Sequence, residues 1–418
     1  MGLIKGSFTI LFFKIAGAGM MLLVNLLLSN LYGAKYLGVF NLLFTIIQIS
    51  SMISRVGIDI YFLKIIPSLN TPNQVTGFLR KSFFRITLSS IIIGALLVIL
   101  APLLDDYFFK EFDAIEYIIW ISLLLLPYTF FTIIPEILRA YENVVVFSFI
   151  RNLLFQLSLV SAMLLLILLN LGNIIDALNY GIIISFIVSL SILYFFLKKK
   201  NLSFLKTTKY SNPILRNSYH MFLTSSILLF MGNLDKFMIG YFIDEENVGY
   251  YSACIRLSIM VTFVLSSVTS YITPKISKAY ALRDFEQLKL HYNKATRLII
   301  ISSLPFILIL VIFPNFFLGL FGESFKDLKN IFYLVVAMNL ANIFFGPLLY
   351  ILNMMDLQVY VRNVLFFAFI FNFLLNILLI PQFGISGAAV STLISTIFWK
   401  SILFIKLQTK LKNLNVSH

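Results

Sequence analysis

Charged side chains lie inside several long apolar stretches of this sequence. Five are cations and two are carboxylates: Lys14, Arg55, Arg151, Lys236 and Arg256, with Asp59 and Asp235. A charge in hydrocarbon costs several kcal/mol, so it persists where it meets water, a partner or a ligand. The excess of cations suits phosphate, because Arg offers planar bidentate donors and Lys a compact charge. The set predicts a cationic, phosphate-binding cavity and disfavours transport of organic cations.

One polar stripe is predicted around Arg55. Gln48, Ser51, Arg55 and Asp59 recur at steps of three and four residues, which places them on one helix face. Arg55 and Asp59 form an i,i+4 pair that neutralises part of the charge. We favour Arg55 as a cavity-lining residue tuned by Asp59. A structural ion pair that locks two helices is the alternative.

Other embedded cations have a simpler alternative, which is to reach the headgroups with a long side chain. Lys14 and Asn25 share one helix face, so Lys14 either lines the cavity or extends to the inner headgroups. For Arg151 the two interpretations are equally supported. Arg362 and Lys400 are expected to extend to the interface.

Three charges fall close together at the start of the second half. Asp235 and Lys236 lie toward the outer end of one predicted span, and Arg256 lies just inside the next. Because a short connection joins these ends, we expect Asp235 to pair with Arg256. Lys236 and Arg256 stay candidates for ligand binding.

Residues for other kinds of chemistry are missing. The single cysteine, Cys254, allows no internal disulfide, and the three histidines at 220, 291 and 418 are too scattered for a ligand set. No Gly-x-x-x-x-Gly-Lys loop occurs, so nucleotide hydrolysis is not expected. We therefore predict no metal, no cofactor and no enzymatic activity.

The elements that hold these charges are predicted to be membrane helices. Of the 418 residues, 60% are apolar and 12% charged, and the mean hydropathy is +0.96. A soluble fold cannot bury that much apolar surface. Runs near the length that crosses about 30 Å of hydrocarbon are found at 8–32, 38–63, 84–104, 115–135, 144–170, 174–197, 218–242, 249–273, 298–320, 328–352, 361–380 and 385–406. We predict an all-α integral membrane protein with about 12 transmembrane helices.

Basic residues gather in alternate connections. The main groups lie within 80–85, 198–216, 275–297 and 406–412, whereas 105–113 and 244–246 are acidic. By the positive-inside rule both termini are cytoplasmic. The net charge of +14 then reflects topology and contact with the lipid bilayer, and no nucleic acid is expected. Between 277 and 297, apolar residues among the charges predict a short amphipathic helix on the inner leaflet. A plain solvated linker is the equal alternative.

The second half of the chain repeats the first. Gly38 returns as Gly249 and Arg151 as Arg362, both 211 positions later, and Pro135 returns as Pro347 one residue out of register. Duplicated lobes are typical of transporters. We predict two six-helix lobes related by the internal repeat, 1–208 with its linker and 209–418.

Several motifs resemble one known family. They are the Lys14-bearing first span, Ala34 to Phe40, Asn233-Leu234-Asp235-Lys236 with Ile239-Gly240, Gly249-Tyr250-Tyr251-Ser252, and Asn376 to Pro381 running into Phe383 to Ala389. As a set they resemble the Wzx-type oligosaccharide-lipid flippases, the polysaccharide-transport branch of the multidrug/oligosaccharidyl-lipid/polysaccharide exporter superfamily. The resemblance covers essentially the whole chain.

The resemblance implies a V-shaped pair of lobes around a cationic cavity. It implies alternating access that moves undecaprenyl-pyrophosphate-linked oligosaccharide across the bacterial plasma (inner) membrane, for O-antigen, capsule or exopolysaccharide. Polysaccharide polymerase and chain-length machinery are left open as partners. Coupling to a proton or sodium gradient, through Asp59 or Asp235, is also left open.

Two other functions remain as alternatives. A cation-coupled multidrug exporter of the same superfamily is disfavoured, because Lys14 stands in the first span where that branch typically has a carboxylate. A membrane-embedded polysaccharide polymerase or glycosyltransferase generally needs a large outer loop. The predicted outer connections are short.

Overall fold

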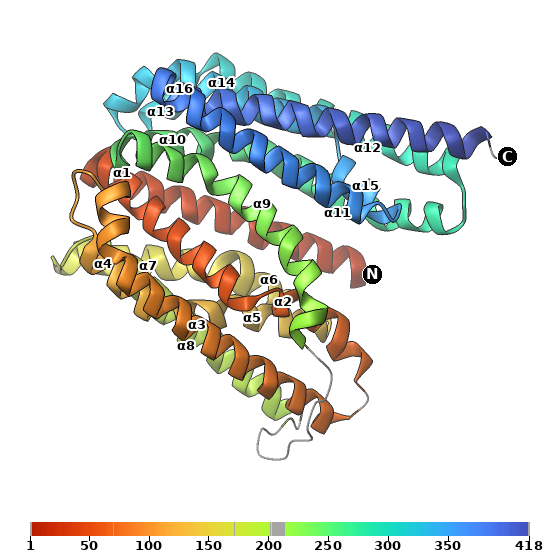
Figure 1. Ribbon diagram of the computed structural model, residues 1–418, viewed down its shortest axis with the longest axis horizontal. Helices are drawn as coiled ribbons and strands as arrows, with labels where there is room; N and C mark the ends of the chain where they lie inside the picture. Colours follow the sequence, from red (N-terminus) through yellow and green to blue (C-terminus); the bar gives the residue numbers. More distant parts are fainter. Residues whose placement is uncertain (1, 70, 171, 201, 203–213, 417–418) are drawn as a thin grey trace. The chain divides into compact units, whose positions relative to one another are not determined.

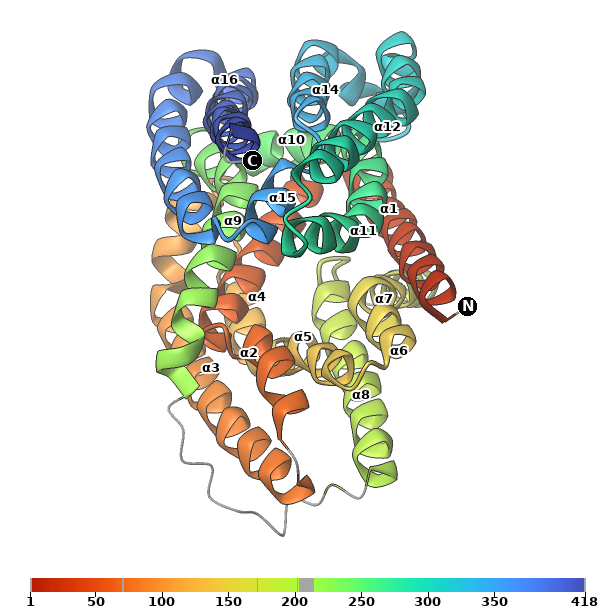
Figure 2. The same ribbon diagram turned by 90° about the vertical axis from the view of Figure 1, so that its right-hand side faces the viewer.

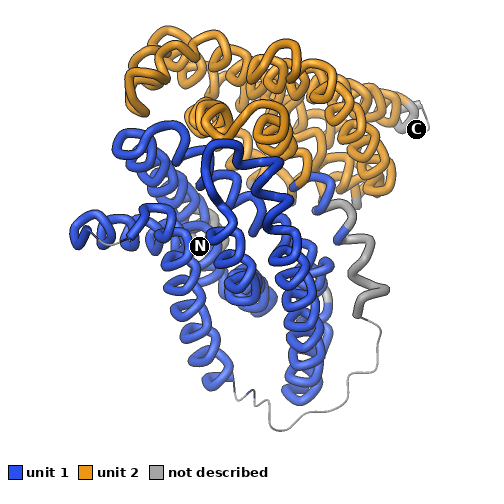
Figure 3. Tube along the Cα trace, turned by 60° about the vertical axis from the view of Figure 1, so that its left-hand side comes forward, with its two compact units in different colours: residues 1–229 blue, residues 230–418 orange. Residues whose placement is uncertain are grey.

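The chain is helical throughout the part that the computed structural model describes. The described residues are 2–69, 71–170, 172–200, 202 and 214–416, and they contain no β-strand. They form two compact units, Met1–Leu229 and Phe230–His418, shown in blue and orange in Figure 3. The predicted division between residues 208 and 209 lies outside the described residues. The all-α prediction is confirmed.

Each unit is built from helices of very different length (Figure 1). Unit 1 contains α1 (Gly2–Arg55), α2 (Ile58–Ile65), η1 (Ile66–Ser68), α3 (Pro72–Phe108), α4 (Ile115–Leu123), α5 (Leu125–Ala140), α6 (Val144–Phe149), η2 (Ile150–Leu154), α7 (Phe155–Leu169) and α8 (Asp176–Lys199). Helix α9 (Ile214–Phe242) passes from unit 1 into unit 2. Unit 2 continues with α10 (Glu245–Ser258), η3 (Ile259–Val261), α11 (Thr262–Ala281), α12 (Phe285–Ile312), α13 (Pro314–Gly319), η4 (Glu323–Leu328), α14 (Lys329–Phe344), α15 (Leu348–Met354) and α16 (Gln358–Val416).

The two longest helices are each interrupted at a glycine. In α1 the break is Gly33, with φ 84° and ψ 177°, and in α16 it is Gly384, with φ 58° and ψ −139°. Glycine fits both places because it alone adopts a positive φ without steric cost. At Gly33 the chain turns back, so the two parts of α1 run in opposite directions (Figure 1, and from a second side in Figure 2). The predicted span 8–32 and most of the span 38–63 therefore share one nominal helix, and the end of the second span lies in α2.

The apolar helices are long enough to cross a bilayer. Within the described residues, eight helical segments qualify by length and composition, and α4 with α5, bent by 48° at their junction, make a ninth if the pair is one span. Large apolar side chains on their outer faces are exposed, for example Ile91, Ile99, Leu298 and Ile312, as lipid contact requires. The chain is thus a multi-pass membrane protein. The total of twelve crossings stays a prediction, as does the repeat.

Helix α5 is central in unit 1, where it packs against α1, α2, α3 and α8. Its buried face is mostly apolar, with Ile133, Ile134, Ile137 and Leu138 fully enclosed. Side chains at positions 129, 132 and 136 interrupt this apolar surface with polar groups. The packing of α5 therefore decides where those polar groups point.

The amphipathic helix expected between 277 and 297 is not a separate element. Helix α11 continues to Ala281 and α12 begins at Phe285, so a tight turn joins two long helices. The Asp284 carboxylate accepts the Gln287 amide proton at 2.9 Å and caps α12. Phe285, Leu288 and Tyr292, read from sequence as a membrane-facing side, are buried. The prediction was wrong because these residues extend the buried stripe of α12.

Candidate functional site

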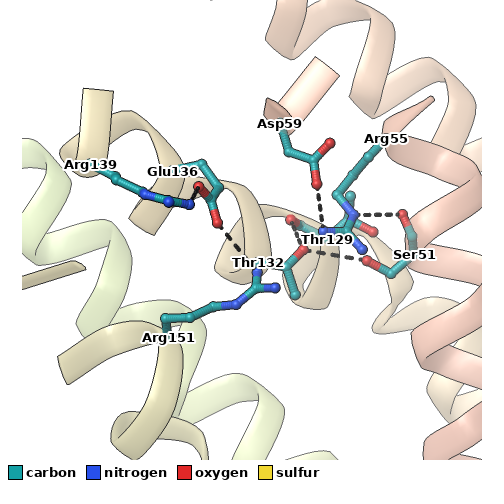
Figure 4. A network of polar contacts seen from close by, with 8 residues as sticks. All are labelled: Ser51, Arg55, Asp59, Thr129, Thr132, Glu136, Arg139 and Arg151. Carbon is teal, nitrogen blue, oxygen red and sulfur yellow. Dashed lines mark hydrogen bonds and ion pairs between the residues drawn. The ribbon is translucent and has the colours of Figure 1, made fainter. Parts of the chain in front are cut away.

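A polar face on α5 organises the embedded charges of unit 1. Thr129, Thr132 and Glu136 share this face, and Thr129 and Glu136 are buried. The Thr132 hydroxyl donates to the Thr129 carbonyl at 2.7 Å and lies 3.4 Å from the Ser51 hydroxyl of α1. Figure 4 shows two groups of charges, one on either side of these threonines.

Arg55 and Asp59 form the first group, across a break in the chain. Helix α1 ends at Arg55, α2 begins at Ile58, and the linking residues Val56 and Gly57 both have positive φ, 47° and 72°. The Arg55 Nε donates to the Ser51 carbonyl at 3.2 Å, and a terminal nitrogen donates to Asp59 Oδ2 at 2.9 Å. A cation at a helix C-terminus and a carboxylate at a helix N-terminus both complement the helix dipoles.

This geometry favours the structural alternative for Arg55. Only 12% of the Arg55 side chain and 17% of the Asp59 side chain are exposed. The pair thus holds α1 to α2 across Val56, for which a positive φ is unfavourable, and Gly57, which tolerates it. A role for Arg55 in binding stays a prediction.

Glu136 is at the centre of the second group. Its carboxylate lies 3.5 Å from a terminal nitrogen of Arg139 through Oε2, and 3.6 Å from one of Arg151 through Oε1. The two arginine side chains are about half exposed, 51% and 45%, whereas that of Glu136 is 10% exposed. The buried Glu136 carboxylate therefore forms ion pairs with two accessible guanidinium groups.

The sequence analysis missed Glu136 and Arg139. The predicted span ended at residue 135, yet Glu136 is flanked by Ile133, Ile134, Ile137 and Leu138. A carboxylate within an apolar run is the same signal that singled out Asp59. Carrying the span one turn further would have found it.

Arg151 projects from an irregular part of its helix. Residues Ile150–Leu154 form the π-helical turn η2, a feature that is frequent at functional sites. Helix α1 approaches this turn very closely, since a Cβ added to Gly17 would lie 1.7 Å from the Asn152 carbonyl oxygen.

Lys14 precedes this contact by one helical turn. Its side chain is partly buried on α1, the helix that packs against α6 and η2. Asn25, predicted on the same face, is fully buried and accepts from Asn41 at 3.4 Å. The first span thus brings Lys14 to the region of Arg151, without a direct contact between them.

In unit 2, Asp235 is held by neutral donors. It is buried, and it accepts from the Tyr251 hydroxyl at 2.6 Å, the Thr392 hydroxyl at 2.7 Å and the Asn376 amide at 3.0 Å. The expected ion pair with Arg256 is absent from these contacts. The prediction was wrong because the chain supplies three polar side chains from α10 and α16 in its place.

The embedded lysines of unit 2, Lys236 and Lys400, form no ion pair with a carboxylate among the described residues. The Lys236 ammonium donates to Asn233 Oδ1 at 3.3 Å, and the charges of both Arg256 and Asp235 act on it. Lys400, expected at the interface, is buried and donates to the Asn342 carbonyl at 2.9 Å. That carbonyl is free because the Gly346 amide bonds to Ile343 instead, where α14 ends. Lys400 is therefore a cap for α14.

Possible metal ligands are not clustered in the described residues. No group of three or more His, Cys, Asp or Glu side chains among them is placed to hold a metal ion. Cys254 is buried. The guanidinium groups can bind anions, and the buried Asp235 carboxylate can take up and release a proton or a cation.

The chain is similar to known proteins in sequence. A family profile described as polysaccharide biosynthesis protein matches residues 10–330. The probable flippase AglR of Haloferax volcanii is 27% identical over 250 residues, which cover 57% of this chain and 50% of AglR. The probable low-salt glycan biosynthesis flippase Agl15 of the same organism is 23% identical over 200 residues, covering 45% and 42%. Each match thus spans about half the length of the relative.

The fold is also that of a known transporter class. A MOP superfamily transporter from Pyrococcus furiosus, described as having a binding pocket of reverse polarity, superimposes with a TM-score of 0.69. The two are 16% identical, and the match covers 98% of this chain and 96% of the other. At this identity the likeness establishes the fold alone.

Proposed function

This chain belongs to the polysaccharide biosynthesis protein family, and from this premise we propose that it flips a lipid-linked oligosaccharide across a membrane. The match over residues 10–330 carries the proposal. Two relatives described as probable flippases support it. Neither is described as an enzyme, in keeping with the prediction of a transporter.

The embedded cations fit a phosphorylated headgroup. A polyprenyl-pyrophosphate carrier places strong negative charge at the boundary of sugar and lipid, where guanidinium groups bind phosphate well. Arg151 and Lys14 in unit 1 are the binding residues we propose first, with Lys236 and Arg256 in unit 2. The sugar would follow the headgroup through water while the polyprenyl tail stays in lipid.

Asp235 is the better of the two candidates for coupling. Asp59 neutralises Arg55, so protonating it would leave a buried cation unpaired. The side chains that hydrogen-bond to Asp235 are neutral, so it can take up a proton or a monovalent cation without breaking an ion pair. We therefore assign the coupling role to Asp235.

The finer parts of the sequence prediction stay proposals. These are an undecaprenyl carrier, a bacterial plasma membrane with both termini in the cytoplasm, and products such as O-antigen or capsule. A polymerase and chain-length machinery would act on the flipped units.

Fractionation of cells that lack this protein tests the function. We expect the lipid-linked oligosaccharide to accumulate on the cytoplasmic face and the surface glycan to fall, with both restored by the wild-type gene. A multidrug exporter would leave the glycan unchanged and raise drug sensitivity. A polymerase would leave single repeat units on the outer face. Either result would contradict the proposal.

A further inference from the structure

The two ion-pair groups of unit 1 differ in how tightly they are made. Arg55 and Asp59 meet at 2.9 Å, one cation to one anion, and both are largely covered. Glu136 meets Arg139 and Arg151 at 3.5 and 3.6 Å, longer than the 2.7–2.9 Å typical of a charge-assisted hydrogen bond. The second group carries an excess of positive charge, and its two ion pairs are long.

The arginines of the second group are the accessible members. Each contributes one terminal nitrogen to a different oxygen of Glu136, which leaves other N–H donors of both guanidinium groups unused. Arg139 also lies over the ring of Phe147, 5.1 Å from its centroid. Such stacking fixes the plane of the guanidinium and leaves its edges for hydrogen bonds.

We propose that Glu136 is an internal counter-ion, which a phosphate group of the substrate displaces from Arg139 and Arg151. Arg139 is then a substrate-binding residue that acts together with Arg151. The inference rests on the proposed function for the identity of the substrate. It assigns to Glu136 control over how tightly the headgroup is held.

Charge and shape favour the exchange. A phosphate group presents more oxygens and more negative charge than a carboxylate, so it can engage both arginines through several hydrogen bonds. When the headgroup leaves, Glu136 pairs with the cations again and lowers the cost of two unpaired charges in an apolar setting. Binding is weakened by this competition, and release becomes easier.

The place of the group in the chain fits the loading step. Arg139 is in the last turn of α5, next to the connection at residues 141–143. The topology predicted from basic residues puts this connection on the cytoplasmic side. A lipid-linked oligosaccharide made in the cytoplasm would meet Arg139 first and Arg151 deeper in the span.

The alternative is that Glu136 only braces α5 against η2. A brace and a competitor predict opposite signs when the carboxylate is neutralised. Losing a brace loosens the arginines and weakens anion binding, whereas losing a competitor strengthens it.

Calorimetric titration of the purified full chain in nanodiscs with inorganic pyrophosphate separates the two. Glu136→Gln is expected to tighten binding about tenfold, within the usual range of coupling between sites. Arg139→Gln and Arg151→Gln are expected to weaken it. Glu142→Gln is the matched control, because Glu142 is exposed in the same connection and its loss changes the net charge equally.

Two further variants keep the test decisive. Glu136→Asp withdraws the charge by one methylene and should tighten binding more weakly, which covers the case that E136Q does not fold. In a background of R139Q with R151Q, E136Q should have no effect. Unchanged or weaker binding in both E136Q and E136D overturns the inference.

Failure of the proposed function would look different. If Glu136→Gln tightens pyrophosphate binding but cells that lack the protein still make normal surface glycan, the anion site is supported and the glycan substrate is rejected. If those cells lose glycan flipping but Glu136→Gln does not tighten pyrophosphate binding, the proposed function is supported and the role of Glu136 as a competitor is rejected.

Discussion

The two units handle charge inside apolar helices in different ways. In unit 1 the described embedded carboxylates, Asp59 and Glu136, each contact arginine. In unit 2 the embedded carboxylate Asp235 accepts hydrogen bonds from hydroxyl and amide groups, and Lys400 donates to a backbone carbonyl. The embedded carboxylates of unit 1 are therefore neutralised by arginine side chains, whereas the embedded Asp235 and Lys400 of unit 2 form hydrogen bonds with neutral polar groups.

The difference suggests a division of labour. A guanidinium that shares its carboxylate can accept an anion in exchange, as we infer for Arg151. A carboxylate whose hydrogen-bond donors are all neutral can accept a proton or a cation. Headgroup binding would then belong to unit 1 and coupling to unit 2, and the variants below test that contrast.

The largest effect is expected from breaking the pair that joins α1 to α2. Asp59→Ala leaves Arg55 buried and unpaired, so we expect a loss of about 3 kcal/mol in the free energy of unfolding. Strain at Val56, whose φ is 47°, would no longer be opposed. Thermal unfolding in detergent measures the loss.

A double variant provides the control for that pair. Arg55→Met with Asp59→Leu removes both charges and should unfold at a higher temperature than Asp59→Ala alone, because no buried charge is left over. A double variant less stable than the single one would show that the two charges do not act as a pair.

A moderate effect is expected from adding a methyl group at the close contact between α1 and η2. Gly17→Ala would place a methyl group 1.7 Å from the Asn152 carbonyl oxygen, and the backbone there cannot move aside cheaply. We expect a loss of about 2 kcal/mol and weaker pyrophosphate binding, because η2 carries Arg151. Gly19→Ala is the matched control, since a Cβ there meets nothing within 4 Å. Equal behaviour of the two variants would show that this approach does not position Arg151.

Much of the fold could be predicted from the sequence, because hydrophobic length and charge asymmetry are local signals. They identified the apolar spans, and the match over residues 10–330 confirms the family resemblance drawn from motifs around Lys14, Gly38 and Asp235. Breaks within helices were harder to predict from the sequence. Nothing in the spacing alone shows that Gly33 and Gly384 interrupt their helices, while other glycines continue a helix.

Partners of the embedded charges were harder to predict than their positions. Asp235 was expected to pair with Arg256 because the two are close in sequence, yet its donors Asn376 and Thr392 come from a helix far along the chain. The i,i+4 pair of Arg55 and Asp59 was predictable because one local geometry defines it. Contacts between distant helices depend on packing, which periodicity does not encode.

Transport in proteoliposomes, measured with and without an imposed proton or sodium gradient, tests the division of labour most directly. The substrate is a polyprenyl-pyrophosphate-linked oligosaccharide, and the variants are Arg151→Gln and Asp235→Asn. We expect Asp235→Asn to keep the basal rate and lose the acceleration by the gradient, and Arg151→Gln to lower the rate under both conditions. A normal rate in Arg151→Gln, or full gradient response in Asp235→Asn, would contradict the account.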